Sequence, residues 1–195
     1  MEAGEVPRNG GNLVEFMGTA VFRGDKMAGS LTVDETAAVL ALRGEMGKVY
    51  KTVEDPLEEG KYVTFRFHQE NKPQYRASFR GDQPVVHVRL QFEVELLSTP
   101  GKTDYSLPEN RRALEEYLAR EYADPLFENL IDKVYYQWGA DPAGFGQLFR
   151  TRFATFDQWL DFKWHERVTD MEITVESEVF IRRFGMLLSS DLSQD

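Results

Sequence analysis

The segment from Val86 to Leu97 limits the folds open to this chain more than any other feature. Apolar and polar residues alternate along it, with an apolar row of Val86, Val88, Leu90, Phe92, Val94 and Leu96 and a polar row of His87, Arg89, Gln91, Glu93 and Glu95. Successive side chains of a strand point to opposite faces of a sheet. Such a strand has one face on a core and one in water, which is typical of antiparallel sheets. We therefore expect a sheet covered by helices on one side only.

A long amphipathic helix is predicted from Leu107 to Trp138. Apolar residues recur there at spacings of three and four, namely at Leu114, Leu118, Tyr122, Leu126, Leu130, Ile131, Val134 and Trp138. At 1.5 Å per residue this helix would be about 45 Å long. Pro125 lacks the helical donor and crowds the carbonyl four residues back, so a kink or break is expected near residues 122–124. The stripe of Leu114, Leu118, Leu126 and Val134 is expected to lie across the sheet.

Residues 16–44 indicate a strand, a tight turn, a second strand and a helix. Phe16, Gly18, Ala20 and Phe22 would share one strand face, and Gly24 and Asp25 suit a hairpin turn. Met27 to Leu31 would form the returning strand. Thr32 and Glu35 have the spacing of a capping box, and Gly44 is placed to end the helix in a left-handed conformation.

Four further segments have strand patterns, namely residues 48–53, 62–68, 75–80 and 171–184. Short helices are predicted over residues 143–149 and 156–167. The fold class that these elements predict is α+β, an antiparallel-rich sheet with helices, including one long helix, packed on one face. The first strands and the last strand are expected to belong to that sheet, and the last to pair near the first.

The composition of the chain argues against several classes of function. The chain has 195 residues, no cysteine and a formal net charge of −10. The negative charge argues against nucleic acid or anionic lipid as the main partner, and the lack of cysteine excludes disulfides and thiol chemistry. No apolar run reaches the roughly 18 residues of a membrane span. We expect a flexible leader over residues 1–12, a single domain over 13–189 and a tail over 190–195.

The residue types that usually carry catalysis form no convincing site. His68, His87 and His165 are not at metal-ligand spacing. The many carboxylates fall mostly on predicted wet faces, where a solvated role is the better interpretation than acid–base chemistry. Gly144-Phe145-Gly146 lacks the lysine and the preceding strand of a phosphate loop. No catalytic, metal or cofactor residue is predicted, and no cofactor is expected.

Arg182 and Arg183 are the candidate partner-docking residues. Strand alternation should direct one of the two to the wet face. That arginine either pairs with an outward glutamate across the sheet, worth at most about 1 kcal/mol, or belongs to a docking surface. The aromatic-rich segment from Phe153 to Trp164 is predicted to be core, and exposed rings there would indicate an interaction patch instead.

Several segments resemble the C-terminal domain of the Ger(x)C family of spore-germination proteins. They are G-T-A-V-F-R-G-D-K-M-A-G from Gly18, D-E-T from Asp34, L-R-G-E from Leu42, D-P-A-G-F-G-Q-L-F from Asp141 and V-F-I-R-R-F-G from Val179. The matches come in family order and span about residues 14–188. In the family the F-G-x-x-F segment is a structural helix, which implies that Phe145 and Phe149 pack inward. No proline is expected at position 125 from the family pattern.

The resemblance implies the C-subunit lipoprotein of a spore germinant receptor, a non-enzymatic interaction domain that works with integral-membrane A and B subunits. Its expected place is the outer face of the spore inner membrane, attached through an N-terminal lipid that this chain lacks, so the chain would be the C-terminal part of a longer protein. Two alternatives stay open. In the first, the domain binds a small germinant in a deep polar pocket on the helix side of the sheet. In the second, it is a hydrolase with two buried carboxyls of raised pKa.

Overall fold

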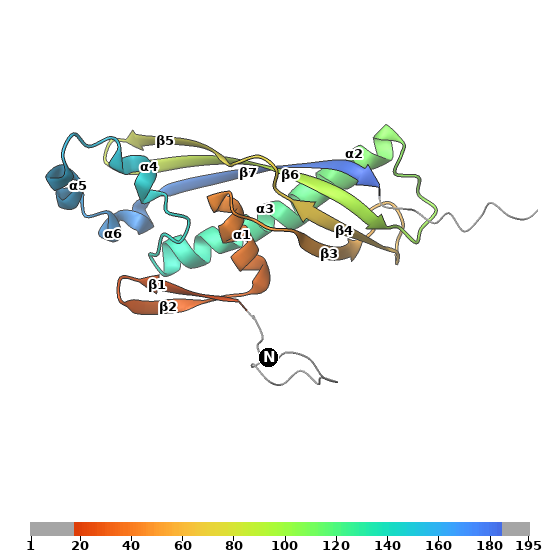
Figure 1. The fold of residues 1–195 in the computed structure, drawn as a ribbon, viewed down its shortest axis with the longest axis horizontal. Coiled ribbons are helices and arrows are strands. Elements are labelled where there is room, and N and C mark those ends of the chain that lie inside the picture. Colours follow the sequence, from red (N-terminus) through yellow and green to blue (C-terminus); the bar gives the residue numbers. More distant parts are fainter. Residues whose placement is uncertain (1–17, 185–195) are drawn as a thin grey trace, which may run out of the picture.

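The computed structural model describes residues 18–184. The predicted leader over residues 1–12, the tail over 190–195, Phe16 and Gly185 lie outside the described residues. Sheet and helices form two layers, with the long helix lying across the sheet (Figure 1). The strands are β1 (Thr19–Arg23), β2 (Lys26–Leu31), β3 (Val49–Glu54), β4 (Tyr62–His68), β5 (Gln74–Arg80), β6 (Gln83–Ser98) and β7 (Glu172–Phe184). The α-helices are α1 (Val33–Arg43), α2 (Pro108–Tyr117), α3 (Asp124–Ile131), α4 (Gly146–Arg150), α5 (Phe156–Phe162) and α6 (Trp164–Arg167).

The predicted α+β fold class is confirmed, and β6 is the central strand of the main sheet. Its apolar row is buried, from Val86 at 0% exposed to Phe92 at 3%. One edge of β6 pairs antiparallel with β5 at its start and with β4 at its end, and β3 continues the sheet beyond β4. The other edge pairs with β7. The helices pack on the apolar face, and the opposite face, carrying the polar row, is called the polar face below.

Two expectations about the sheet are wrong. The last strand, β7, pairs with β6, to which it runs parallel, and not with β1, and the first strands do not belong to the main sheet. The hairpin β1–β2 is a separate two-stranded sheet. Because β2 leads through Thr32 directly into α1, which packs on the helix side, the hairpin is held in the helix layer. There Gly29 lies against the Trp138 ring, so close that a Cβ at Gly29 would be 2.3 Å from it.

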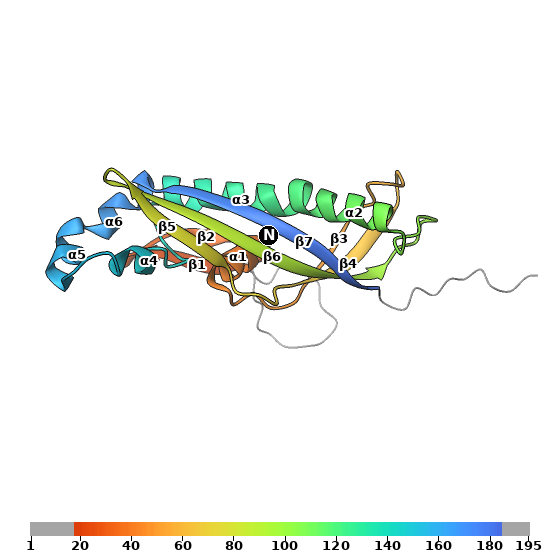
Figure 2. The same ribbon diagram turned by 90° about the horizontal axis from the view of Figure 1, so that it is seen from above.

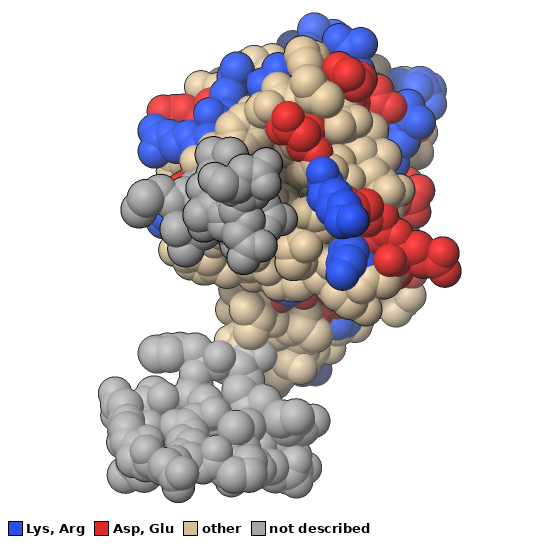
Figure 3. All heavy atoms as spheres, turned by 90° about the vertical axis from the view of Figure 1, so that its right-hand side faces the viewer, with Lys and Arg blue, Asp and Glu red and all other residues tan. Residues whose placement is uncertain are grey.

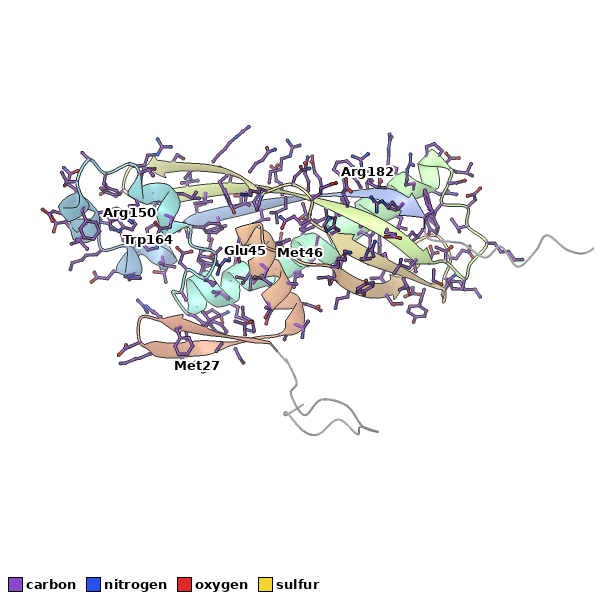
Figure 4. All side chains as sticks on the ribbon, in the orientation of Figure 1. Met27, Glu45, Met46, Arg150, Trp164 and Arg182 are labelled. Carbon is purple, nitrogen blue, oxygen red and sulfur yellow. The ribbon has the colours of Figure 1, made fainter. Side chains whose placement is uncertain are left out.

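In β1 the buried residue does not belong to the face that Gly18, Ala20 and Phe22 were predicted to share. Val21 is buried, whereas Phe22 is 58% exposed and pairs with the equally exposed Met27 across the hairpin. Figure 4 shows Met27 on the side of the hairpin away from the main sheet. The hairpin turn itself is as expected, with Gly24 at a φ of +63°.

The chain stays helical from Pro108 to Gln137, so the break expected at Pro125 is absent. Two π-helical stretches, η1 (Leu118–Ala123) and η2 (Asp132–Gln137), alternate with α2 and α3. Pro125 is the second residue of α3, which begins where η1 ends. A π turn is one residue wider than an α turn, which relieves the crowding between the proline ring and the preceding turn. The stripe predicted to cover the sheet is buried at Leu114, Leu118 and Val134, while Leu126 is partly buried.

The start of α1 is fixed by the predicted capping box. The Glu35 amide donates to Thr32 Oγ1 at 3.3 Å, and the Thr32 amide donates to Glu35 Oε2 at 2.7 Å. The helix ends at Gly44 with a φ of +71°. Burial by itself raises the pKa of Glu35, but hydrogen bonds from Lys133 and Thr32 outweigh it, so the pKa is lowered and the carboxylate stays charged.

Replacing Thr32 by alanine is expected to destabilise the domain by about 1 kcal/mol, because the Glu35 amide loses its acceptor at the helix start. Equilibrium unfolding in urea measures the change. Thr52→Ala is the matched control, since Thr52 bonds only to the Thr64 hydroxyl on an exposed strand face. An equal loss in both variants would contradict the assigned role of the cap.

Candidate functional site

The polar face of the main sheet carries a series of cross-strand ion pairs. Arg80 contacts Glu172 at 2.7 Å, Arg182 contacts Glu93 at 3.5 Å, and Arg89–Glu178 and Arg66–Glu95 are paired in the same way. A hydrogen bond from the Gln91 side chain, and to a smaller extent the contact with Arg89, lower the pKa of Glu178, so this acid stays ionised. Exposed pairs of this kind contribute about 0–1 kcal/mol each. Their main effect is to fix where charge is presented on the face.

A β-bulge places both candidate arginines on this polar face. Val94 pairs with Ile181 and Glu95 pairs with Arg183, so Arg182 is an extra residue in β7. A bulge of this kind resets the alternation of side chains. The expectation that only one arginine faces the wet side is therefore wrong. Arg182 contacts Glu93, and Arg183 lies opposite Glu95.

The two arginines line a surface hollow of about 190 Å³, called the polar-face hollow below. Its other lining residues are Lys48, Arg66, His68, Glu70, Glu93, Val94 and Glu95. Arg66 and Arg182 are paired, whereas Arg183 and Lys48 have no ion-pair partner among residues 18–184. The Tyr50 side chain, and next the carboxylate of Glu95, raise the pKa of Arg66. Glu70 likewise has no ion-pair partner within residues 18–184, so the hollow presents two unpaired positive charges and one unpaired negative charge on a chain whose net charge is −10.

Figure 4 places Arg182 near the C-terminal end of β7, at the end of the molecule opposite Arg150 and Trp164. Figure 3 looks onto that end, where basic and acidic side chains lie close together. Sequence reasoning found the two arginines but not Lys48, Arg66 or Glu70. The alternation of β4 and β6 places Arg66 and Glu93 on polar faces, but only the strand pairing shows that these faces meet.

The two alternative functions gain no support from the described residues. The hollow between α1 and α3, one of several beside the helices, is about 30 Å³ and mostly apolar, which is room for little more than a water. Its one acidic residue, Asp34, is paired with Lys51. Within residues 18–184, the carboxyls with a clearly shifted pKa are Glu35, Glu58, Asp104 and Glu178, and each is lowered. A hydrolytic acid would need a raised value.

The three histidines lie apart. His68 lines the polar-face hollow, His87 lines a second hollow farther along the face, and His165 accepts a hydrogen bond from Arg23 through its carbonyl oxygen. Within the described part of the chain there is no group of three or more His, Asp or Glu placed to hold a metal ion. Nor is any described helix long and apolar enough to cross a membrane.

The segment from Asp141 to Phe149 is structural. One Asp141 oxygen accepts from the Phe145 amide at 2.8 Å and the other from the Gly146 amide at 2.7 Å, which fixes the start of α4. Trp164 Nε1 also donates to Asp141, at 3.2 Å. Phe145 and Phe149 are buried, as the resemblance implied. The glycines of this segment do not form a phosphate loop. Gly146 leaves room for the Trp164 ring, because a Cβ at Gly146 would lie 2.6 Å from Trp164 Nε1.

The aromatic segment is only partly core, because Trp164 is its one buried aromatic side chain and Phe153, Trp159 and Phe162 are half-buried. Trp164 is buried, and its ring stacks on Phe149 with centroids 5.2 Å apart. Phe153, Trp159 and Phe162 form further ring contacts with one another and with Phe79. Two residues of α5 are exceptions, since Phe156 is 58% and Leu160 56% exposed. One exposed ring does not amount to the aromatic patch that an interaction surface would show.

A solved structure shares this architecture. The crystal structure of the GerBC protein superimposes with a TM-score of 0.65 and 18% sequence identity over 80% of the present chain. The matched part is 48% of the GerBC chain, so the present chain spans about half the length of that structure. At this identity the likeness shows a common fold.

The family follows from the sequence itself. The family model described as "Spore germination B3/ GerAC like, C-terminal" matches residues 17–185, and the chain belongs to that family. The resemblance drawn from the separate motifs is thereby confirmed. No curated protein matches the chain.

Proposed function

We propose that this domain is a non-enzymatic interaction domain of a germinant-receptor C subunit, taking part with integral-membrane subunits in the nutrient-triggered start of germination. The polar-face hollow is its docking surface. The observation that carries the proposal is the bulge in β7, which presents Arg182 and Arg183 together on a sheet face that no described helix covers. Family membership supports the setting in spore germination.

Charge supports the same role. Within residues 18–184, Arg183 and Lys48 are not committed to ion pairs, while Arg182 is held by Glu93 at 3.5 Å and remains 60% exposed. Complementary charges across an interface steer association and fix its register. In the proposed receptor the partners are the A and B subunits at the outer face of the spore inner membrane. An N-terminal lipid would attach the full-length protein to that membrane.

Co-purification with the membrane subunits tests this function. The doubly substituted variant Arg182→Glu and Arg183→Glu is expected to lose retention of the A and B subunits, because two repulsive charges replace two attractive ones. Its melting temperature should stay within a few degrees of the wild type, since both side chains are exposed.

Arg80→Glu is the matched control. Arg80 lies on the same face and is 67% exposed, but its contact is with Glu172 at the other end of β7. Retention by this control together with loss in the double variant would support the hollow as the docking surface. Equal retention by all variants would refute it, and no retention of the wild-type domain would assign assembly to other parts of the full-length protein.

A further inference from the structure

One edge of β7 carries no strand. β7 pairs with β6 alone, and β4 and β5 occupy the other edge of β6. Within residues 18–184, the outer edge of β7 therefore presents main-chain groups that no sheet partner satisfies. Such an edge is a template for pairing with another chain unless it is blocked.

The outer edge of β7 is only partly blocked by other residues of the domain. The Ile181 amide, near the C-terminal end of β7, donates to Glu115 Oε1 on α2 at 2.7 Å, so Ile181 faces away from β6. Alternate residues of a strand direct their main-chain groups to the same edge. Ile173, Val175 and Ser177 therefore face the outer edge as well, and no hydrogen bond to their amides comes from residues 18–184. The Ser177 hydroxyl is likewise buried without a partner.

A groove of about 280 Å³ runs beside this open part of the edge. One wall is β7 at Ile173, Thr174 and Val175, and the other is the long helix at Phe127, Glu128 and Ile131, with Tyr136 beyond. Figure 2 shows the long helix lying alongside β7. We call this feature the edge groove. An edge strand beside a helix offers main-chain hydrogen bonds on one side and apolar side-chain contacts on the other, the arrangement that captures extended peptides.

The charges that line the edge groove indicate which kind of strand would bind there. Neither Lys nor Arg lines it, and Glu128 has no ion-pair partner within the described part of the chain. From Glu172 to Ile181, β7 itself contains no Lys or Arg, so this stretch of a second copy would offer Glu128 no opposite charge. The complementary occupant is a strand with apolar residues in alternation with Lys or Arg.

We propose that the edge groove binds an extended, basic segment of a partner protein, which adds as a strand to β7. This surface is separate from the polar-face hollow, which lies at the other end of β7, and the proposal stands whether or not that hollow docks the receptor subunits. Apolar side chains of the added strand contact Ile173, Val175 and Ile131, and a basic side chain contacts Glu128.

The test uses a fluorescently labelled peptide, acetyl-Lys-Val-Lys-Val-Lys-Val-Lys-amide, titrated with the whole chain. Saturable binding to the wild type is expected, and Glu128→Lys should weaken it by about tenfold or more because a contact charge is reversed. Glu116→Lys is the matched control, since Glu116 is an exposed acid on the preceding stretch of the same helix and does not line the groove. It should bind as the wild type does.

Two further measurements separate strand addition from simple charge attraction. A peptide N-methylated at alternate residues, which loses main-chain donors along one edge, should not bind. Hydrogen exchange should show new protection of the Val175 and Ser177 amides when the unmodified peptide is added. Absence of saturable binding at millimolar peptide, equal binding by Glu128→Lys and Glu116→Lys, or protection confined to other amides would each overturn the proposal.

Discussion

Replacing Asp141 by alanine is expected to lower the free energy of unfolding by about 3–5 kcal/mol, because a half-buried, charged acceptor of several hydrogen bonds is lost. The Phe145 and Gly146 amides and Trp164 Nε1 would lose their acceptor. The Tyr135 hydroxyl, which donates to Asp141 at 3.3 Å, would lose it as well. Burial, and next the charge of Asp141, raise the pKa of Tyr135 well above its ordinary value, so this hydroxyl stays protonated and needs an acceptor.

The Asp141 carboxylate links three parts of the chain, namely the end of the long helix, the start of α4 and α6. Urea unfolding followed by tryptophan fluorescence measures its contribution. Asp141→Asn keeps one acceptor oxygen but places an amide donor against other donors, so an intermediate loss is expected. Asp161→Ala, at an exposed acid of α5, is the control and should change stability by less than about 0.5 kcal/mol. A loss below 1 kcal/mol for Asp141→Ala would contradict this role.

Replacing Phe149 by alanine is expected to cost about 3–5 kcal/mol, the range for removal of a fully buried aromatic side chain. Phe149 is 0% exposed and contacts two rings, Trp164 at 5.2 Å and Phe79 at 5.1 Å between centroids. Phe79 belongs to β5, so the substitution removes the contact that holds α4 on the sheet. Thermal and urea unfolding both measure the loss.

Phe156→Ala is the matched control for this substitution. Phe156 is the same residue type in the same aromatic segment, but it is 58% exposed, and its contact is with the Arg150 guanidinium, 5.5 Å from the ring centroid. A change of less than about 1 kcal/mol is expected there, since little apolar area is buried. Similar losses in the two variants would mean that the end of the domain around α5 is more tightly packed than the structure indicates.

Local signals were sufficient for most of the secondary structure. The capping box at Thr32 and Glu35, the left-handed Gly44 and the alternation from Val86 to Leu96 depend on residues close together in the chain. The inward packing of Phe145 and Phe149 came from the family resemblance instead. At Pro125 the local rule predicted a kink or a break; no break occurs, and the chain instead takes a π-helical pattern in the turn before the proline.

The candidate site was predictable only in part. Arg182 and Arg183 stand out in the sequence as adjacent charges on a strand. Their common face could not be read from alternation, because one inserted residue in β7 reverses it, and the insertion is visible only in the register with β6. Lys48 and Arg66 come from distant segments and reach the polar-face hollow through the pairing of β3, β4 and β6.

The sequence by itself determined which residues are apolar on one side, where helices begin and end, and which family the chain belongs to, because these depend on side-chain chemistry at short spacing. Tertiary structure alone decided that β7 is parallel to β6, that β1 and β2 leave the main sheet, and that an edge stays open beside the long helix. Strand partners are chosen by packing between segments far apart in the chain. The residue pattern within one strand does not determine which other strand will pair with it.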